Sequence, residues 1–238
     1  MSSTPVELRF TEFYNKWVSQ LEQLHHELLQ AATTTSSDAN QHELQALISK
    51  ATTHFKEYYT VKWAAAHEDI LAFYAPKWLT PLENAHFWFT GFKPTTVFKL
   101  VDKLKLTDLT EAQMKGIKEL KLKVKMEEDK VESEMERQQV GVADWKMVEL
   151  ARMTSRVKAD QSGHVGRKVD GMSQVAVSRI LGGAEKVMKA GDCVRLKAMK
   201  SVLDVLTPRQ SVEFLAAIAL VHVQLRKEGL KIHQTFRI

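Results

Sequence analysis

The chain has 238 residues, of which 44% are hydrophobic and 26% charged, a composition typical of a folded globular protein with one domain or at most two. Its single cysteine excludes an internal disulfide, and no uninterrupted apolar run approaches the roughly 18 residues that a membrane span requires. The first residues contain no apolar stretch of the kind found in secretory signals, so we expect a nuclear and/or cytoplasmic protein that does not enter a membrane.

The formal net charge of +5 is unevenly distributed along the chain. Residues 1–60 contain four basic and seven acidic residues, whereas the remainder contains 30 basic and 22 acidic ones. A basic portion can attract nucleic acid, but the lysines between 115 and 125 alternate with apolar residues and precede a run of acids. The N-terminal region also lacks the Lys/Arg-rich helix that leads into leucine heptads in a basic leucine zipper. Direct nucleic-acid binding is therefore not expected.

Hydrophobic periodicity predicts two long helices in the N-terminal third. In the first, apolar residues recur at steps of three and four and share one face: Phe10, Phe13, Tyr14, Trp17, Leu21, Leu24 and Leu28. Residues 31–40 are small and polar without a period, which predicts a loop. A second helix is expected from Gln41 to Tyr74, before Pro76 prevents its continuation.

Two capping boxes mark helix starts in the middle of the chain. Thr80 and Glu83 form the first, with Pro81 at the first helical position; we expect this helix to contain Trp88 as a buried anchor and to end at Gly91. A short helix follows from Pro94 to Leu104. The second box, Thr110 to Gln113, opens a long helix that reaches about Gln139.

Further helices are expected over 142–158, from about Met172 onward and over 193–206, with a glycine-containing polar loop near 162–171. Thr207-Pro208 repeats the Thr-Pro start and opens the last helix, which is expected to end at about Glu228, before Gly229. No segment alternates apolar and polar residues over the length of a strand. The predicted fold is therefore all-α: residues 1–238 form a single helical bundle of long antiparallel helices.

No motif in the sequence predicts catalysis. Three His-Glu pairs begin the zinc-protease motif, but its second histidine is replaced by Gln30, Ala46 and Leu71. No Cys-x-x-Cys pair is present to bind zinc, and Cys193 lies in a helical stretch without a histidine nearby in sequence. We therefore expect neither an enzyme nor a metal site.

Two blocks of sequence nevertheless resemble one family. Residues 73–101, FYAPKWLTPLENAHFWFTGFKPTTVFKLV, contain Trp78, the run 81–85, Trp88, Gly91 and Pro94, and residues 192–217 contain DCVRLKAMKSVLDVLTPRQSVEFLAA. Both blocks resemble the plant Delay of Germination domain, which also forms the C-terminal half of the plant TGACG-binding bZIP transcription factors. With no bZIP region in the sequence, the chain is similar to the free-standing members. Most of these motif residues also have a structural explanation as caps and core anchors.

The resemblance implies a non-enzymatic regulator that acts through protein partners in abscisic-acid and seed-dormancy-type signalling and in transcription regulation. One partner class that it implies is the type 2C protein phosphatases, bound through a segment that corresponds here to 12–18. Tyr14 and Trp17 match that segment and are the candidate partner-binding residues, with packing into the bundle as the alternative. Association with the bZIP relatives is a weaker alternative, and a homo-oligomer stays open.

The resemblance also implies haem binding through two histidines four residues apart in the last helix. His222 matches the first and is the candidate haem ligand, but Arg226 occupies the second position and stays protonated, so it cannot ligate iron. No cofactor is therefore required in this interpretation. A small-molecule sensor for haem or a fatty-acyl ligand remains the alternative function, and a core role for His222 remains the structural one.

Overall fold

The computed structural model describes residues 3–33, 40–104, 109–141, 152 and 163–235. In these ranges the chain is helical and forms no strand, which confirms the all-α prediction. None of the helices in these ranges is long and apolar enough to span a membrane. The helices, in chain order, are α1 (Pro5–Thr33), α2 (Asn40–Glu68), α3 (Leu71–Tyr74), α4 (Pro81–Ala85), α5 (Thr96–Leu104), α6 (Glu111–Gly141), α8 (Gly163–Leu203) and α9 (Pro208–Thr235).

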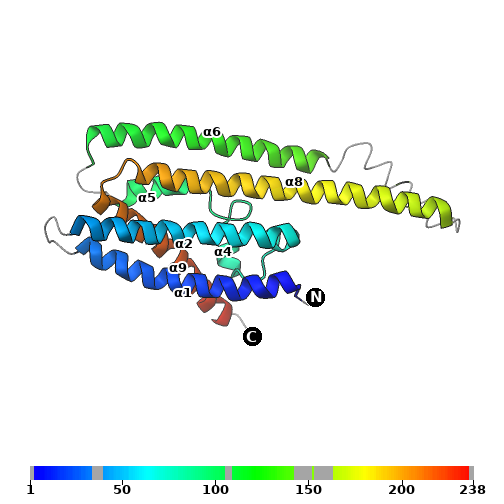
Figure 1. The fold of residues 1–238 in the computed structure, drawn as a ribbon, viewed down its shortest axis with the longest axis horizontal. Helices are drawn as coiled ribbons and strands as arrows, with labels where there is room; N and C mark the ends of the chain where they lie inside the picture. The colour runs from blue at the N-terminus through cyan, green and yellow to red at the C-terminus, as the bar shows by residue number, and fades with distance from the viewer. Residues whose placement is uncertain (1–2, 34–39, 105–108, 142–151, 153–162, 236–238) are drawn as a thin grey trace.

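The long helices run side by side in antiparallel pairs. Figure 1 shows α1 beside α2 and α6 beside α8, with α9 crossing behind the first pair. Helix α9 packs most extensively on α1 and also contacts α2, α4 and α5. It is therefore the helix around which the N-terminal pair and the short central helices assemble.

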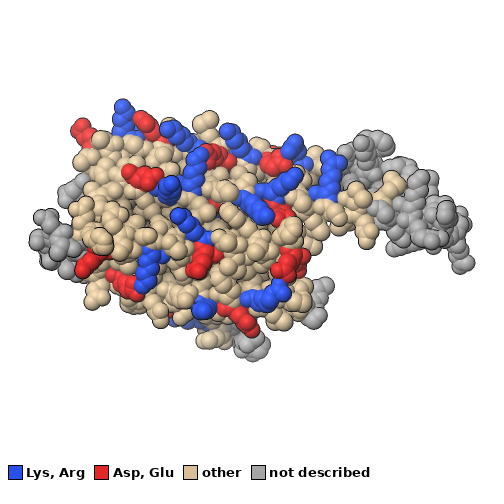
Figure 2. All heavy atoms as spheres, viewed as in Figure 1, with Lys and Arg blue, Asp and Glu red and all other residues tan. Residues whose placement is uncertain are grey.

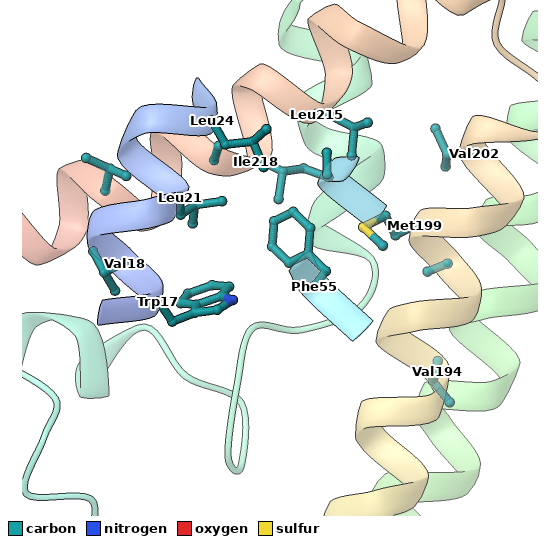
Figure 3. Close-up of a cluster of buried hydrophobic side chains, with 14 of the residues drawn as sticks. Trp17, Val18, Leu21, Leu24, Phe55, Val194, Met199, Val202, Leu215 and Ile218 are labelled. Carbon is teal, nitrogen blue, oxygen red and sulfur yellow. The ribbon is translucent and has the colours of Figure 1, made fainter. Parts of the chain in front are cut away.

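The core follows the apolar face predicted for the first helix. Phe10, Leu21 and Leu28 are fully buried, and Phe13 is half-buried at the edge of the face. Figure 3 shows side chains of this face converging with Phe55 of α2, and with Leu215 and Ile218 of α9. Burial of apolar area on this scale is the main stabilising contribution to the fold.

All three predicted Thr-led helix starts form capping boxes. Glu83 N–H donates to Thr80 Oγ1, and Thr80 N–H donates back to the Glu83 carboxylate, at 3.2 and 2.7 Å. The same reciprocal pair occurs between Thr110 and Gln113 at the start of α6 and between Thr207 and Gln210 at the start of α9. Each box satisfies two backbone donors that a helix start otherwise leaves unpaired.

The predicted second helix is too long. Helix α2 ends at Glu68, and the short helix α3 begins at Leu71. Asp69 lies at this break, where its carboxylate accepts a hydrogen bond from Ala72 N–H at 3.2 Å. Aspartate side chains compete for backbone donors in this way and so favour helix starts over helix interiors.

The helix predicted to reach Gly91 is also too long, because α4 ends at Ala85. Residues 88–91 form a tight turn in which Trp88 N–H donates to Gly91 O at 2.6 Å, and the residue with positive φ is Phe89, at 58°. The prediction that Gly91 is the left-handed end of a helix is therefore wrong. Trp88, predicted to be buried, is half-buried.

The loop predicted near 162–171 is wrong from residue 163 onward, since α8 is helical over Gly163–Leu203. Each glycine costs a helix only about 1 kcal/mol relative to alanine, which a helix of this length tolerates. The loop predicted at 31–40 is helical at both edges, and its centre, 34–39, lies outside the described residues. The helix predicted over 142–158 also lies outside them, apart from helical residue 152.

Candidate functional site

Tyr14 and Trp17, the candidate partner-binding residues, are core residues. Their exposed fractions are 3% and 2%. Trp17 Nε1 donates to His54 O at 3.1 Å, and its ring stacks on the His54 imidazole with centroids 5.2 Å apart. Of the two roles that the sequence left open for these aromatics, the structure supports packing into the bundle, because α2 and α9 cover that face of α1.

Tyr14 belongs to a buried polar cluster centred on Glu83, which is 2% exposed. Its hydroxyl donates to Glu83 Oε1 at 2.8 Å, while Glu83 Oε2 accepts from Thr80 N–H and from Arg226 at 3.0 Å. Burial raises the pKa of Tyr14 well above its usual value, and the Glu83 charge raises it further. The phenol is therefore a permanent donor at physiological pH.

Arg226 ties three elements together. Besides Glu83 it donates to Trp78 O at 2.6 Å and to Asn15 Oδ1 at 2.7 Å, and its guanidinium lies 5.4 Å from the centre of the Tyr14 ring. These contacts join α9 to α1 and to the start of α4 with geometry that suits the planar fork of arginine. The residue at the position of the family's second histidine is thus a structural cation.

His222 lies one turn before Arg226 on α9, among aromatic rings. Ring centroids of Phe92, Trp17 and Phe55 lie 4.7, 5.7 and 5.9 Å from that of His222. Burial lowers the pKa of His222 to about 4, so the imidazole is neutral at pH 7. Its ring makes no hydrogen bond to any other residue that the structure describes.

The residues around His222 do not fit haem. Arg226 is held in the Glu83 cluster and has no lone pair for iron, and the cavity beside His222 measures only about 80 Å³. Pockets that enclose drug-sized ligands are several times larger, at about 300–1,000 Å³. Haem ligation by the pair of positions 222 and 226 is therefore not available in this arrangement.

A second buried polar cluster joins α2 to α8. Lys62, 1% exposed, donates to Asp192 Oδ1 at 2.9 Å, and Trp63 Nε1 donates to Asp192 Oδ2 at 3.0 Å. Arg195 donates to Asp192 Oδ1 as well, at 2.5 Å. Burial lowers the pKa of Lys62 to about 8, since the charged ammonium loses its water. One carboxylate thus neutralises two buried cations only in part.

This cluster holds the loop between α4 and α5, residues 86–95, which we call the 86–95 loop. Lys62 donates to Thr90 O and Thr90 Oγ1, and Arg195 donates to Phe92 O and Trp88 O, all within 3.0 Å. Gly91 permits this approach, because a Cβ there would lie 3.0 Å from Arg195 Cζ. The glycine therefore favours close packing with Arg195, and its φ is not in the left-handed region.

Helix α6 holds the other side of the 86–95 loop. Glu132 accepts from Trp88 Nε1 at 2.9 Å and from Lys93 at 2.7 Å. Glu128, fully buried, accepts from Thr95 N–H and Thr95 Oγ1 at the start of α5, where a negative charge also suits the helix dipole. Buried polar groups thus fix the loop from three helices.

Sequence reasoning did not identify Lys62, Asp192, Arg195 or Glu132 as site residues. The available signal was the spacing of Asp192 and Arg195, which lie three residues apart and therefore on one face of α8. Nothing local marked Lys62, which lies 130 residues from its carboxylate partner. Cys193 is exposed, and partial burial followed by the Asp192 charge raises its pKa, which disfavours the reactive thiolate.

On the face shown in Figure 2, basic and acidic side chains are intermingled over the helices. Lys121 pairs with Asp102 and Lys125 with Asp129, while Lys197 of α8 pairs with Glu127 of α6. Within the ranges that the structure covers, no group of three metal-binding side chains is close enough to hold an ion. The lysine-rich part of α6 therefore carries charges of both signs.

Comparison with known proteins agrees with the sequence blocks described above. A family model described as "DOG1: Seed dormancy control" matches residues 14–103. The chain is 51% identical to "Protein DOG1-like 4" of Arabidopsis thaliana, over 96% of this chain and 95% of that protein. It is 28% identical to "Protein RESPONSE TO ABA AND SALT 1" of Arabidopsis thaliana, over 95% and 97%.

The TGACG-binding relatives match over only part of their length. The chain is 31% identical to "TGACG-sequence-specific DNA-binding protein TGA-2.1" of Nicotiana tabacum, over 92% of this chain but 46% of that protein. The likeness to these factors is thus confined to the domain that they share with the free-standing proteins. With a full-length match at 51% identity and the family model over its N-terminal and central helices, the chain belongs to the Delay of Germination (DOG1) family.

Proposed function

We propose that this chain is a non-enzymatic plant regulator that acts through protein partners in abscisic-acid and seed-dormancy-type signalling, in the nucleus and/or the cytoplasm. The observation that carries this proposal is the full-length likeness to the DOG1-like proteins. The name of a second full-length relative, RESPONSE TO ABA AND SALT 1, supports the hormone context. The shared domain of the TGACG-binding factors supports a link to transcription without a DNA contact by this chain.

The part of α1 that is available to a partner differs from the part that matches the family segment. Within 12–18, Glu12, Asn15 and Lys16 are exposed, whereas Tyr14 and Trp17 are buried. The matching residues therefore maintain the fold, and three of the five differing residues, Glu12, Asn15 and Lys16, face the solvent. If a type 2C protein phosphatase binds α1, its specificity depends on this exposed strip of Glu12, Asn15 and Lys16.

A binding experiment tests the proposal with a matched pair of charge reversals. Purified full-length protein is titrated with a type 2C protein phosphatase, using the wild type, Lys16→Glu and Lys123→Glu. Both lysines are exposed and make no ion pair with another described residue, but Lys123 lies on α6, which packs on α8. We expect Lys16→Glu to weaken binding about tenfold and Lys123→Glu to leave it within about twofold.

Equal affinity for all three proteins would place the phosphatase contact away from α1. Absence of binding to any phosphatase would contradict this partner class. Binding of a TGACG-binding factor, titrated in the same way in place of the phosphatase, would favour the transcriptional partner. Each outcome leaves the family assignment intact, since that depends on the sequence match alone.

A further inference from the structure

A pocket lies between the 86–95 loop and helices α2, α5, α8 and α9. Its volume is about 80 Å³, and it is lined in part by half-buried residues such as Phe87, Leu100 and Leu196, so it opens to the surface. His222 and Phe55 line its inner wall. An apolar cavity between the helices of a bundle, bordered by a loop, is a common setting for a small-ligand site.

The wall contains hydrogen-bonding groups that the protein itself does not use. Tyr58, Tyr59 and His222 line the pocket, and none of their side chains makes a hydrogen bond to another residue in the described part of the chain. Burial raises the pKa of both tyrosines and lowers that of His222, so all three are neutral at pH 7. Neutral hydroxyl and imidazole groups can donate to a ligand oxygen without a charge of their own.

The charge of the wall has one sign. Lys62, Lys93 and Arg195 line the pocket, and no aspartate or glutamate does. Two carboxylates, those of Asp192 and Glu132, pair with these three cations, and neither residue lines the pocket. Lys93 uses its ammonium for one hydrogen bond, and Arg195 uses three of the five donors of a guanidinium, so donors remain for a ligand.

We propose that this pocket binds a small apolar carboxylate whose body is no larger than about one aromatic ring. The carboxylate is attracted to the cationic wall, and the apolar body lies against the aromatic side chains around His222. The size limit follows from the volume, because an apolar cavity of about 150 Å³ holds one benzene molecule. At about 80 Å³ the pocket encloses part of a ring, and the rest reaches the mouth. The inference goes beyond the proposed function and does not depend on any protein partner.

Calorimetric titration of the purified full-length protein with three probes tests the ligand class. Benzoate carries the ring and the charge, benzyl alcohol carries the ring without the charge, and palmitate carries the charge on a long chain. We expect saturable benzoate binding with a Kd in the millimolar range or tighter, and binding of benzyl alcohol at least about tenfold weaker. Absence of saturable benzoate binding, equal affinity for benzyl alcohol, or tighter binding of palmitate would each overturn the proposal.

A matched pair of lysine variants tests the location. Lys93→Met removes a cation from the wall, and Glu132 keeps its hydrogen bond from Trp88 Nε1. Lys99→Met removes the same charge from the exposed face of α5, outside the pocket. We expect benzoate affinity to fall about tenfold in Lys93→Met and to stay within about twofold in Lys99→Met, with thermal unfolding confirming that both are folded. Equal losses in the two variants, or none in Lys93→Met, would overturn the assignment to this pocket.

Discussion

Gly229 of α9 passes directly against Thr80, the residue that caps α4. A Cβ built on Gly229 would lie 2.7 Å from Thr80 Cβ and closer still to Thr80 Oγ1. The sequence places Gly229 where a helix end is expected, but α9 continues through it to Thr235. The glycine is thus explained by the contact between α9 and the α4 cap.

This contact predicts a large effect of one methyl group. Gly229→Ala forces Thr80 out of its position, so we expect a loss of about 2–4 kcal/mol from overpacking and from the weakened capping box. Gly182→Ala is the matched control, since a Cβ at Gly182 of α8 meets no atom within 4 Å. There alanine is expected to be neutral or to stabilise by up to about 1 kcal/mol. Urea unfolding of both variants measures the difference, and similar stabilities would contradict the close approach.

The buried positions of Tyr14 and Trp17 predict loss of stability rather than loss of a binding surface. Trp17→Ala removes a core indole and is expected to cost about 3–5 kcal/mol. Tyr14→Phe leaves Glu83 with one donor fewer and is expected to cost about 1–2 kcal/mol. Lys16→Glu, on the exposed side of the same helix, is the control and should change stability by less than about 0.5 kcal/mol. Thermal unfolding of the three variants checks this order of stability losses. A Trp17→Ala melting temperature equal to that of the wild type would show that Trp17 lies on the surface.

The parts of the fold that local sequence determines were predictable. Thr80, Thr110 and Thr207 were identified as helix starts because a capping box uses residues only three positions apart. The stripe of α1 was identified because the helical period alone sets which residues share a face. These signals need no knowledge of the rest of the chain.

The polar clusters were not predictable, because their members are distant in sequence. Arg226 and Glu83 are 143 residues apart, and Lys62 and Asp192 are 130 apart. In a helical pattern each of these charges is indistinguishable from a solvated one. The aromatic crowding on α1 was visible, but burial of Tyr14 and Trp17 depends on α2 and α9, whose position local periodicity does not give. Tertiary packing determines both the pairing of these charges and the burial of the two aromatic residues.

His222 predicts a stability loss in acid. Its pKa is about 4 in the folded protein, below the 6.5 of a free histidine, so the unfolded chain binds the proton more tightly. Stability from this group is therefore present above pH 6.5 and decreases as the pH falls toward 4. His222→Phe should weaken this dependence by about 1–2 kcal/mol between pH 6.5 and 4.5, whereas His42→Phe, at an exposed position on α2, should not. Denaturant unfolding at the two pH values measures it, and identical pH profiles for wild type and His222→Phe would contradict the burial of the imidazole.

The buried Lys62 predicts a change of folding stability in the alkaline range. Its folded pKa of about 8 lies below the ordinary 10.5, so above pH 8 the folded protein releases a proton that the unfolded chain still holds. Stability from this group therefore rises from pH 8 toward 10.5, and it is lowest below pH 8, where the ammonium stays charged in the core. Because Tyr14, Tyr58 and Tyr59 have raised pKa values that reduce stability above about pH 10, the measurement is confined to pH 7.5–9.5.

Within that window, the wild type should gain about 1–2 kcal/mol relative to Lys62→Met, which carries no titratable group. Lys130→Met, at an exposed position on α6, is the control and should follow the wild type. Asp192→Asn leaves Lys62 and Arg195 without their carboxylate and is expected to cost about 3–5 kcal/mol relative to the wild type at pH 7.5. That deficit should shrink as the pH rises and the lysine loses its charge. Parallel pH profiles for wild type and Lys62→Met, together with a deficit of Asp192→Asn that stays constant, would show that Lys62 is solvated rather than buried.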